Sequence, residues 1–305
     1  MTKGQTGVEV QQVQVMLNLV LNIRITVDGI FGNQTEQAIK MFQRAFTLSE
    51  TGLFNALTKA KLIEQYTLKT SVKSDSIADF YIPLSPANFV SYKTKKLGIM
   101  GHHTVSDGNP KTVVRVWNED QRGAVATHYV LGREMVNGSK EYDGLLVQCL
   151  PLDNFAFHVL MQRMGFSDKH NQFINQSYIG FEFCSWGCLD YRGGKFYALG
   201  SNIEIPTYQV CELKTPFRTY KYWHKYTDAQ LQRFKRAALE LNKLLGLKLQ
   251  TDKALNITDW FELSWDAMAA RRKLTTHTNF EYGKFDMFPQ RELLDTIEEI
   301  YYAGE

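Results

Sequence analysis

Apolar residues recur at helical spacing along the first part of the chain. One such stripe consists of Val10, Val13, Leu17 and Val20. Because residues three and four apart share one helix face, the stripe predicts a first amphipathic helix. A second helix follows, with Asn33 as its N-cap and Glu36 completing a capping box, and a short third helix is expected over 57–66. Residues 1–66 are therefore expected to form a small three-helix domain.

The pattern changes in the second part, where short apolar runs alternate with amphipathic stretches. The segments expected to be strands are one that ends at His102-His103, then the alternating segment 127–132, then 144–150, 177–184 and the short 273–276. The stretches typical of helices are 227–245, capped by Thr227, then 259–270 and 291–301. Alternating strands and helices indicate an α/β domain with a mixed sheet and flanking helices. We place this domain at 85–305, after a polar linker over 67–84.

Composition is that of an ordinary globular protein, with 305 residues of which 44% are hydrophobic and 22% charged. This length allows one large domain or two unequal ones. The formal net charge of +3 is too small to favour nucleic acid as a partner, although it suits an approach to an anionic polymer. The four cysteines, at 149, 184, 188 and 211, match neither a paired zinc motif nor a disulfide framework.

The N-terminal residues show no apolar segment of the kind found in secretory signal peptides. No stretch of the sequence reaches the length that a membrane-spanning helix needs. We therefore expect synthesis in the cytoplasm, no insertion into a membrane, and action elsewhere only after release by another factor.

Paired histidines at the end of a predicted strand are the first candidates for chemistry. On its own the pair His102-His103 does not establish a metal site, because most histidines are surface or core hydrogen-bonding residues. His277 also ends a predicted strand, and Asp286 follows it after a short loop. A hydrolytic zinc site takes three protein ligands and keeps one position open for water, whose pKa the bound metal lowers to about 7. His102, His277 and Asp286 are thus candidate zinc ligands.

A set of core and turn positions within residues 1–66 carries a family resemblance. These positions are Val13, Gln14, Leu17, 27–32, Thr35, Ala38, Phe42, Gln43, Leu48, Thr51, Gly52 and 58–62. With them the segment resembles the type 1 peptidoglycan-binding domain, a three-helix family. The resemblance implies binding to the bacterial cell wall. The alternative is a helical module that has lost its ligand and serves as a spacer.

Several short motifs of the second domain carry another resemblance. They are 99–104, 128–130, 157–158, Asn175 with 179–182, 226–230, and His277 with 284–286. Through them residues 85–305 resemble the type 2 zinc-dependent N-acetylmuramoyl-L-alanine amidases, which are related to peptidoglycan recognition proteins. The resemblance implies that Zn²⁺ is held by His102, His277 and Asp286. It also implies that Lys284 helps to polarise the carbonyl group that is attacked.

The same resemblance assigns roles to residues that do not bind the metal. Glu182, on an otherwise apolar predicted strand, maps onto a glutamate that assists the water, and His158 maps onto a histidine of the substrate groove. His103 and Asn175 are further substrate-binding candidates, with a structural role as the alternative for His103. A carboxylate buried without a partner costs free energy, which favours a functional role for Glu182. The alternative is that Glu182 only orients a neighbouring group.

The sequence departs from the amidase pattern at a few positions. Thr127 stands where some relatives have a catalytic tyrosine, which places this chain in the branch assisted by a glutamate. Thr276 replaces a glycine before the second zinc ligand, and Met287-Phe288 replace Pro-Gly after the last one. Segment 188–224 is longer than in minimal members, and we expect it to shape the groove.

Together these features predict a peptidoglycan hydrolase with a wall-binding domain and a zinc amidase domain. Its expected reaction is cleavage of the amide bond between N-acetylmuramic acid and L-alanine of the stem peptide. We expect a monomer whose partner is bacterial peptidoglycan, in the setting of a phage endolysin. Two alternatives stay open: a non-catalytic peptidoglycan receptor of the same fold, and a wall-anchoring protein of a virion or spore.

Overall fold

The computed structural model describes residues 1–21, 23–70, 77–85, 88–91, 93–120, 123–161, 164–252 and 257–303. The chain forms two compact units, Met1–Ser76 and Ile77–Glu305. Residues 71–76 of the predicted linker lie outside the described residues. The described helices include none that is both long enough and apolar enough to cross a membrane.

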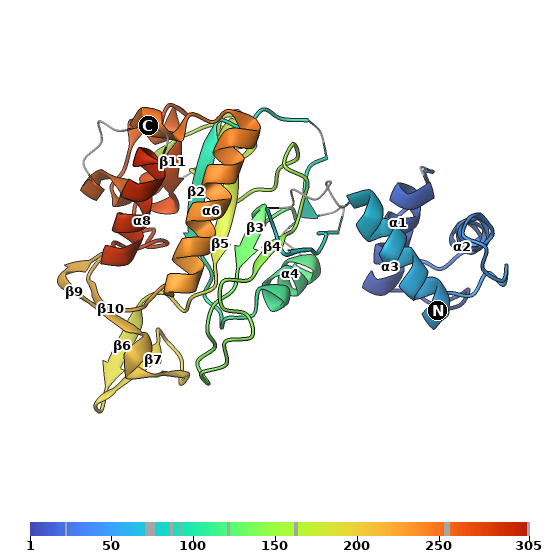
Figure 1. Ribbon diagram of the computed structural model, residues 1–305, viewed down its shortest axis with the longest axis horizontal. Helices are drawn as coiled ribbons and strands as arrows, with labels where there is room; N and C mark the ends of the chain where they lie inside the picture. Colours follow the sequence, from blue (N-terminus) through green and yellow to red (C-terminus); the bar gives the residue numbers. More distant parts are fainter. Residues whose placement is uncertain are drawn as a thin grey trace. The chain divides into compact units, whose positions relative to one another are not determined.

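The first unit contains the expected three helices (Figure 1). They are α1 (Val8–Leu21), α2 (Asn33–Ala45) and α3 (Ala56–Thr70). The predicted cap of the second helix is wrong, because Gly32 is the N-cap and makes no side-chain bond, while Asn33 is already helical. The extended residue that precedes the first turn of α2 is Gly32. Because glycine has no side chain, no side-chain hydrogen bond caps this helix.

Two buried glutamines fix the turns between these helices. Gln14 donates to Asp28 Oδ1 at 2.8 Å and accepts from the backbone N–H of Gly29 at 2.9 Å. Gln43 repeats the arrangement at the next turn, where it accepts from the N–H of Gly52 at 2.9 Å. Both glycines have a φ near +70°, which a residue with a Cβ rarely adopts. The turns are therefore held from the core by side-chain amides.

The second unit is built on a six-stranded mixed sheet with the order β1-β4-β3-β5-β2-β11. Its strands are β1 (Phe80–Tyr81), β2 (Gly98–His103), β3 (Tyr129–Leu131), β4 (Leu146–Gln148), β5 (Tyr178–Phe183) and β11 (Leu274–Thr276). Strands β3, β5, β2 and β11 run parallel, and β4 is antiparallel to β3. The mixed α/β fold is confirmed. Because β1 pairs with β4, residues 77–84 belong to this unit and not to a linker.

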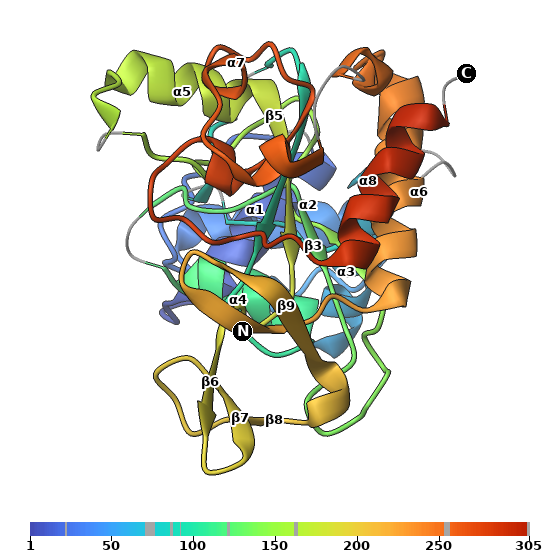
Figure 2. The same cartoon turned by 90° about the vertical axis from the view of Figure 1, so that its left-hand side faces the viewer.

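Helices cover both faces of the sheet. On one face lie α6 (Asp228–Leu245) and α8 (Arg291–Tyr302), which pack on Ile99 and Phe181. Against the other face pack α4 (Pro110–Glu119), α5 (Asp168–Ser177) and α7 (Trp265–Met268). Figure 2 shows α6 and α8 on one side of the strands and α5 on the other. This three-layer arrangement buries every residue of β2.

The expected helix over 259–270 is wrong in its length. The chain there forms the 3₁₀ turn η5 (Ile257–Phe261) and then the short α7. Ser264 accepts a hydrogen bond from Ala267 N at 3.2 Å, so it caps α7 and separates the two pieces. The other long helices end close to their predicted limits, and Thr227 forms a capping box with Gln230.

Segment 188–224 forms a β-rich insertion. It contains β6 (Leu189–Arg192), β7 (Lys195–Ala198), β8 (Glu204–Ile205), η3 (Thr207–Gln209), β9 (Val210–Phe217) and β10 (Tyr220–His224). The first three strands form one antiparallel sheet, and β9 and β10 form a hairpin. The turn between β6 and β7 uses Gly193 and Gly194, which both have positive φ.

Candidate metal centre

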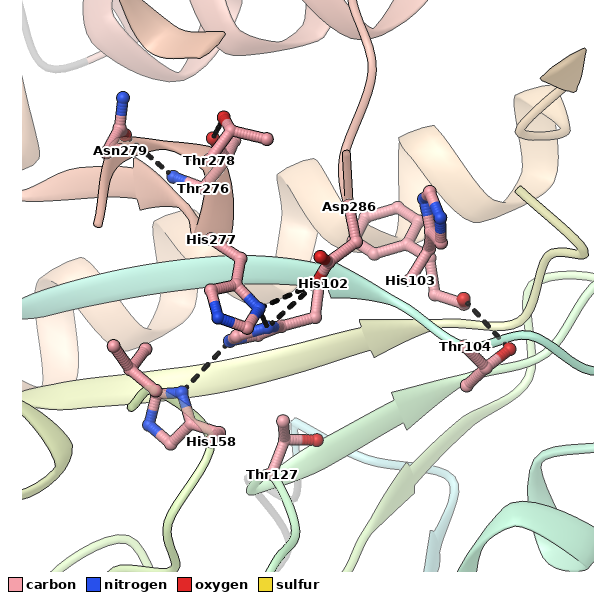
Figure 3. A network of polar contacts seen from close by, with 12 residues as sticks. His102, His103, Thr104, Thr127, His158, Thr276, His277, Thr278, Asn279 and Asp286 are labelled. Carbon is pink, nitrogen blue, oxygen red and sulfur yellow. Dashed lines mark hydrogen bonds and ion pairs between the residues drawn. The ribbon is translucent and has the colours of Figure 1, made fainter. Parts of the chain in front are cut away.

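Two histidines and an aspartate meet at the C-terminal end of the parallel strands (Figure 3). His102 Nδ1 lies 3.1 Å from His277 Nδ1 and 3.3 Å from Asp286 Oδ2. The third side of this triangle, from His277 Nδ1 to Asp286 Oδ2, measures 2.8 Å. These are the three residues that the sequence analysis proposed as metal ligands, and the structure brings them together.

The donor atoms of this cluster suit a zinc ion. Ligands at about 2.0–2.2 Å from a tetrahedral metal lie roughly 3.3 Å from one another, close to the separations seen here. Both imidazoles are buried, and two facing ring nitrogens beside a carboxylate are stabilised when a cation lies among them. Burial by itself would raise the pKa of Asp286, but the two facing imidazoles hold that pKa well below its usual value. Nitrogen and oxygen ligands of this kind are those that zinc prefers.

Strand register explains why the cluster forms here. Thr276, the last residue of β11, pairs with Gly101 of β2, so His277 and His102 follow at neighbouring strand ends. His277 begins the 3₁₀ turn η6 (His277–Asn279), in which Thr276 and Asn279 form a capping box. A Cβ on Gly101 would lie 2.4 Å from Met287 Sδ, so glycine there lets the residue after Asp286 pack on the strand.

His158 holds the ring of His102 from the side away from the cluster. Its Nδ1 lies 2.9 Å from His102 Nε2, and both rings are buried. We assign the shared proton to His102 Nε2, because this tautomer leaves the Nδ1 lone pair directed at the cluster. Burial lowers the pKa of His102 to about 4 and, with the neighbouring His102, that of His158 far below its usual value. Both rings are therefore neutral at pH 7, as metal binding requires.

Asn175 supports His158 and does not line the cleft. It is fully buried. Its Oδ1 accepts from the backbone N–H groups of His158 at 2.7 Å and Val159 at 3.0 Å. Its Nδ2 donates to the carbonyls of Val159 and Asn171. With its amide fully occupied, Asn175 positions the loop that carries His158, a role that differs from the predicted contact with substrate.

Glu182 lies beside His102 on the same face of the sheet. The two residues are register partners on β5 and β2. The carboxylate borders the cleft, and it makes no hydrogen bond or ion pair with the part of the chain that the structure describes. Burial raises the pKa of Glu182 well above its usual value, an effect that Asp286 increases and Lys284 opposes. When ionised, a carboxyl group with a raised pKa is a stronger base than an ordinary carboxylate.

A cleft of about 490 Å³ opens over these groups. Lys284 lines it on the loop before Asp286, and Thr127 lines it as well. Two further aromatic residues line the same cleft, Trp117 of α4 and Tyr282, and neither was predicted from the sequence. Tyr282 is 68% exposed, and its place beside the predicted ligands was the signal that could have identified it.

His103 points to different surroundings from those of His102. Its Nδ1 lies 2.8 Å from the hydroxyl of Tyr226, and its ring lies against Trp223 and Phe285. Gly187 packs on its other nitrogen, since a Cβ there would lie 2.6 Å from Nε2. His103 thus packs among aromatic residues at the edge of the cleft.

Comparison with known proteins supports the first unit most directly. Residues 6–62 match the family model described as "Putative peptidoglycan binding domain", which agrees with the resemblance of residues 1–66. No curated protein matches the chain.

Three solved structures are similar to the chain at low identity. "Structure of PlyL" is 13% identical, with 72% of this chain and 94% of that chain covered and a TM-score of 0.37. "Solution structure of the PlyG catalytic domain" is 13% identical, with 73% and 93% covered and a TM-score of 0.39. A structure of a PlyL mutant is 12% identical, with 73% and 97% covered and a TM-score of 0.37.

Proposed function

We propose that the protein is a peptidoglycan hydrolase of the zinc-dependent N-acetylmuramoyl-L-alanine amidase type. The observation that carries this proposal is the cluster of His102, His277 and Asp286 beside Glu182 in one open cleft. The bond cleaved is the amide between the lactyl group of N-acetylmuramic acid and L-alanine. The domain that matches the peptidoglycan-binding family supports a wall substrate.

Zn²⁺ would be held by His102 Nδ1, His277 Nδ1 and Asp286 Oδ2. When bound, zinc supplies a Lewis acid that acidifies a water molecule and polarises a carbonyl oxygen. His158 keeps the Nδ1 lone pair of His102 available, and η6 fixes the position of His277. These contacts preorganise the ligand set before substrate arrives.

The proton transfers fall to Glu182. Its carboxylate accepts a proton from the attacking water, whose oxygen forms the new bond to the carbonyl carbon. The same proton then passes to the amine of L-alanine as the carbon–nitrogen bond breaks, and the second proton of the water is lost from the new lactyl carboxyl group to the freed amine, which leaves a carboxylate and an ammonium. Lys284 borders the cleft, where its ammonium stabilises the negative charge that develops on the carbonyl oxygen. Thr127 stands where one branch of the amidase family has a catalytic tyrosine, so we assign the proton transfers to Glu182 alone.

Digestion of purified peptidoglycan tests the proposal. Mass spectrometry should find free stem peptides that begin with L-alanine, and a chelator should abolish their release. Metal analysis should find one zinc per chain, and His102→Ala should lose both metal and activity. Stoichiometric zinc without any cleavage would favour a non-catalytic receptor, and recovery of the chain in purified virions without wall cleavage would favour an anchoring protein.

A phage endolysin is the biological setting that we propose for this activity. Such an enzyme reaches the wall from inside the infected cell, after another protein has opened the membrane. Cell lysis that depends on co-expression of a membrane-opening protein would support this setting.

A further inference from the structure

The first unit carries an apolar groove of about 420 Å³ between α2 and the extended segment that precedes it. Its apolar lining comes from Ile23 and Ile25 on the segment and from Ala38 and Met41 on α2. Met41 is 47% exposed, which is high for a methionine in so small a domain. The core of this unit takes other residues of α2, since Phe42 and Ile39 are fully buried.

Hydrogen bonds hold the extended segment that forms one side of this groove. Asn18 of α1 donates to the carbonyl of Ile25 at 2.9 Å and accepts from its N–H at 2.7 Å. The next residue, Thr26, donates its N–H to Gln34 Oε1 at 3.3 Å and so joins the segment to α2. A groove with rigid walls binds its ligand without paying for loop ordering.

Polar groups at the groove select the class of ligand. Arg24 is the only charged residue among those that line it, and it is exposed and forms no ion pair with described residues. Gln34 and Gln37 add exposed side-chain amides. This lining matches a short peptide that has small aliphatic side chains and a carboxylate. The aliphatic side chains would contact the apolar lining, and the carboxylate would pair with Arg24.

The same lining argues against a sugar ring as the ligand. Sugar rings bind chiefly by stacking on flat aromatic faces, and the described residues of the groove include no aromatic side chain. Of the two parts of peptidoglycan, the glycan is therefore the poorer match. The stem peptide, with its alanine methyl groups and free carboxylates, is the better one.

We propose that this groove binds the stem peptide of peptidoglycan, with its methyl groups on Ile23, Ile25 and Met41 and a carboxylate on Arg24. The proposal rests on the proposed wall-binding role of the domain. It names the part of the wall that is recognised and the surface that recognises it.

Binding of a synthetic pentapeptide to the full chain tests this assignment. The probe, L-Ala-γ-D-Glu-L-Lys-D-Ala-D-Ala, contains no muramyl amide bond, so its binding does not depend on hydrolysis. Calorimetry gives the affinity, and methyl NMR signals of Ile23, Ile25 and Met41 report the location. We expect these signals to shift and Met41→Glu and Arg24→Gln each to weaken binding about tenfold or more.

Matched controls lie on α3, outside the groove. Leu57→Glu replaces an exposed apolar side chain by a carboxylate, and Lys59→Gln replaces an exposed cation by an amide. The peptide affinity of both variants should stay within twofold of wild type. Melting temperatures verify that all four variants fold. Unchanged binding by both groove variants, shifts confined to the metal cleft, or equal displacement by N-acetylglucosamine oligomers would overturn the proposal. If the peptide does not bind while purified wall is still cleaved, only the groove assignment fails.

Discussion

Side-chain alternation along β2 gives two adjacent histidines different surroundings. His102 points to the face that carries Glu182, and His103 lies against Tyr226 and Trp223. Successive residues of a strand face opposite ways, so a shift of one residue in register would exchange these roles. The parallel pairing of β2 with both β5 and β11 fixes that register from two sides. One strand thus supplies a candidate metal ligand and a packing residue at consecutive positions.

Glu182→Gln is the substitution that isolates the proton transfer. Glutamine keeps the size and hydrogen-bonding shape of the side chain, and Glu182 has no partner among the described residues to lose. We expect the variant to fold and to keep its zinc, and turnover to fall about 10²–10⁴-fold, the usual effect of removing a general acid or base. Zinc content, melting temperature and turnover should be measured on one preparation. Near-native turnover in the zinc-loaded variant would rule out the catalytic role.

His158→Ala should act through the metal site. Removing its Nδ1 leaves the buried Nε2 of His102 without an acceptor, so the imidazole is less firmly oriented. Loss of such a partner lowers metal affinity or activity about 10–100-fold. Competition with a zinc-binding dye measures the affinity directly. His170→Ala is the control, since that ring stacks on Phe166 and bonds the carbonyl of Met268. Equal zinc affinity in both variants would contradict the positioning role.

At the level of elements, the sequence predicted best what local chemistry decides. Helix α6 was predictable because Thr227 and Gln230 cap it and its apolar stripe is continuous. Strand β1 was missed because its two residues are defined only by pairing with β4, which is distant in sequence. The helix expected over 259–270 was interrupted by Ser264, whose side chain caps α7 in preference to extending the earlier turn.

The candidate site shows the same division. His102 could be located because it ends an apolar run, and His277 because it follows a short predicted strand. The contact between His102 and His158 could not, because it depends on where Asn175 holds the intervening loop. Periodicity reports the face on which a residue lies, whereas a loop's path follows from tertiary hydrogen bonds.

Lys96, just before β2, should make the stability of the second unit depend on pH. Its ammonium is buried and donates to the carbonyls of Asn154 at 2.7 Å and Gln176 at 3.0 Å. Burial lowers the pKa of Lys96 to about 7, against the opposing charge of Asp153. Above this pH the unfolded chain binds more protons than the folded one. The contribution of Lys96 to the free energy of unfolding should therefore rise as pH increases from about 7 towards 10.

Comparison with Lys96→Met isolates this contribution from other titrating groups. Methionine keeps the length of the side chain and does not titrate. We expect the unfolding free energy of the wild type, relative to the variant, to increase by roughly 1 kcal/mol per pH unit above neutrality. Denaturant unfolding of both proteins at several pH values measures the difference. A difference that does not change with pH would show that Lys96 keeps an ordinary pKa in the folded protein.

At the level of the whole molecule, the proposed wall binding and the proposed catalysis belong to separate compact units. Each unit has its own buried core, and the described residues of the candidate metal cluster and its cleft all belong to Ile77–Glu305. The peptidoglycan-binding match falls entirely within Met1–Ser76. The two functions should therefore be separable by truncation.

Removal of residues 1–76 should weaken binding to walls and spare the chemistry. On an insoluble polymer, a binding domain raises the local concentration of the catalytic unit, whereas a small soluble substrate gains nothing from it. We expect residues 77–305 to sediment less with purified cell walls and to cleave soluble muropeptides at a rate close to that of the full chain. Sedimentation and turnover should be measured for both proteins after equal zinc content has been verified. Undiminished sedimentation of the truncated protein would show that the catalytic unit holds the wall by itself and that the first unit is a spacer.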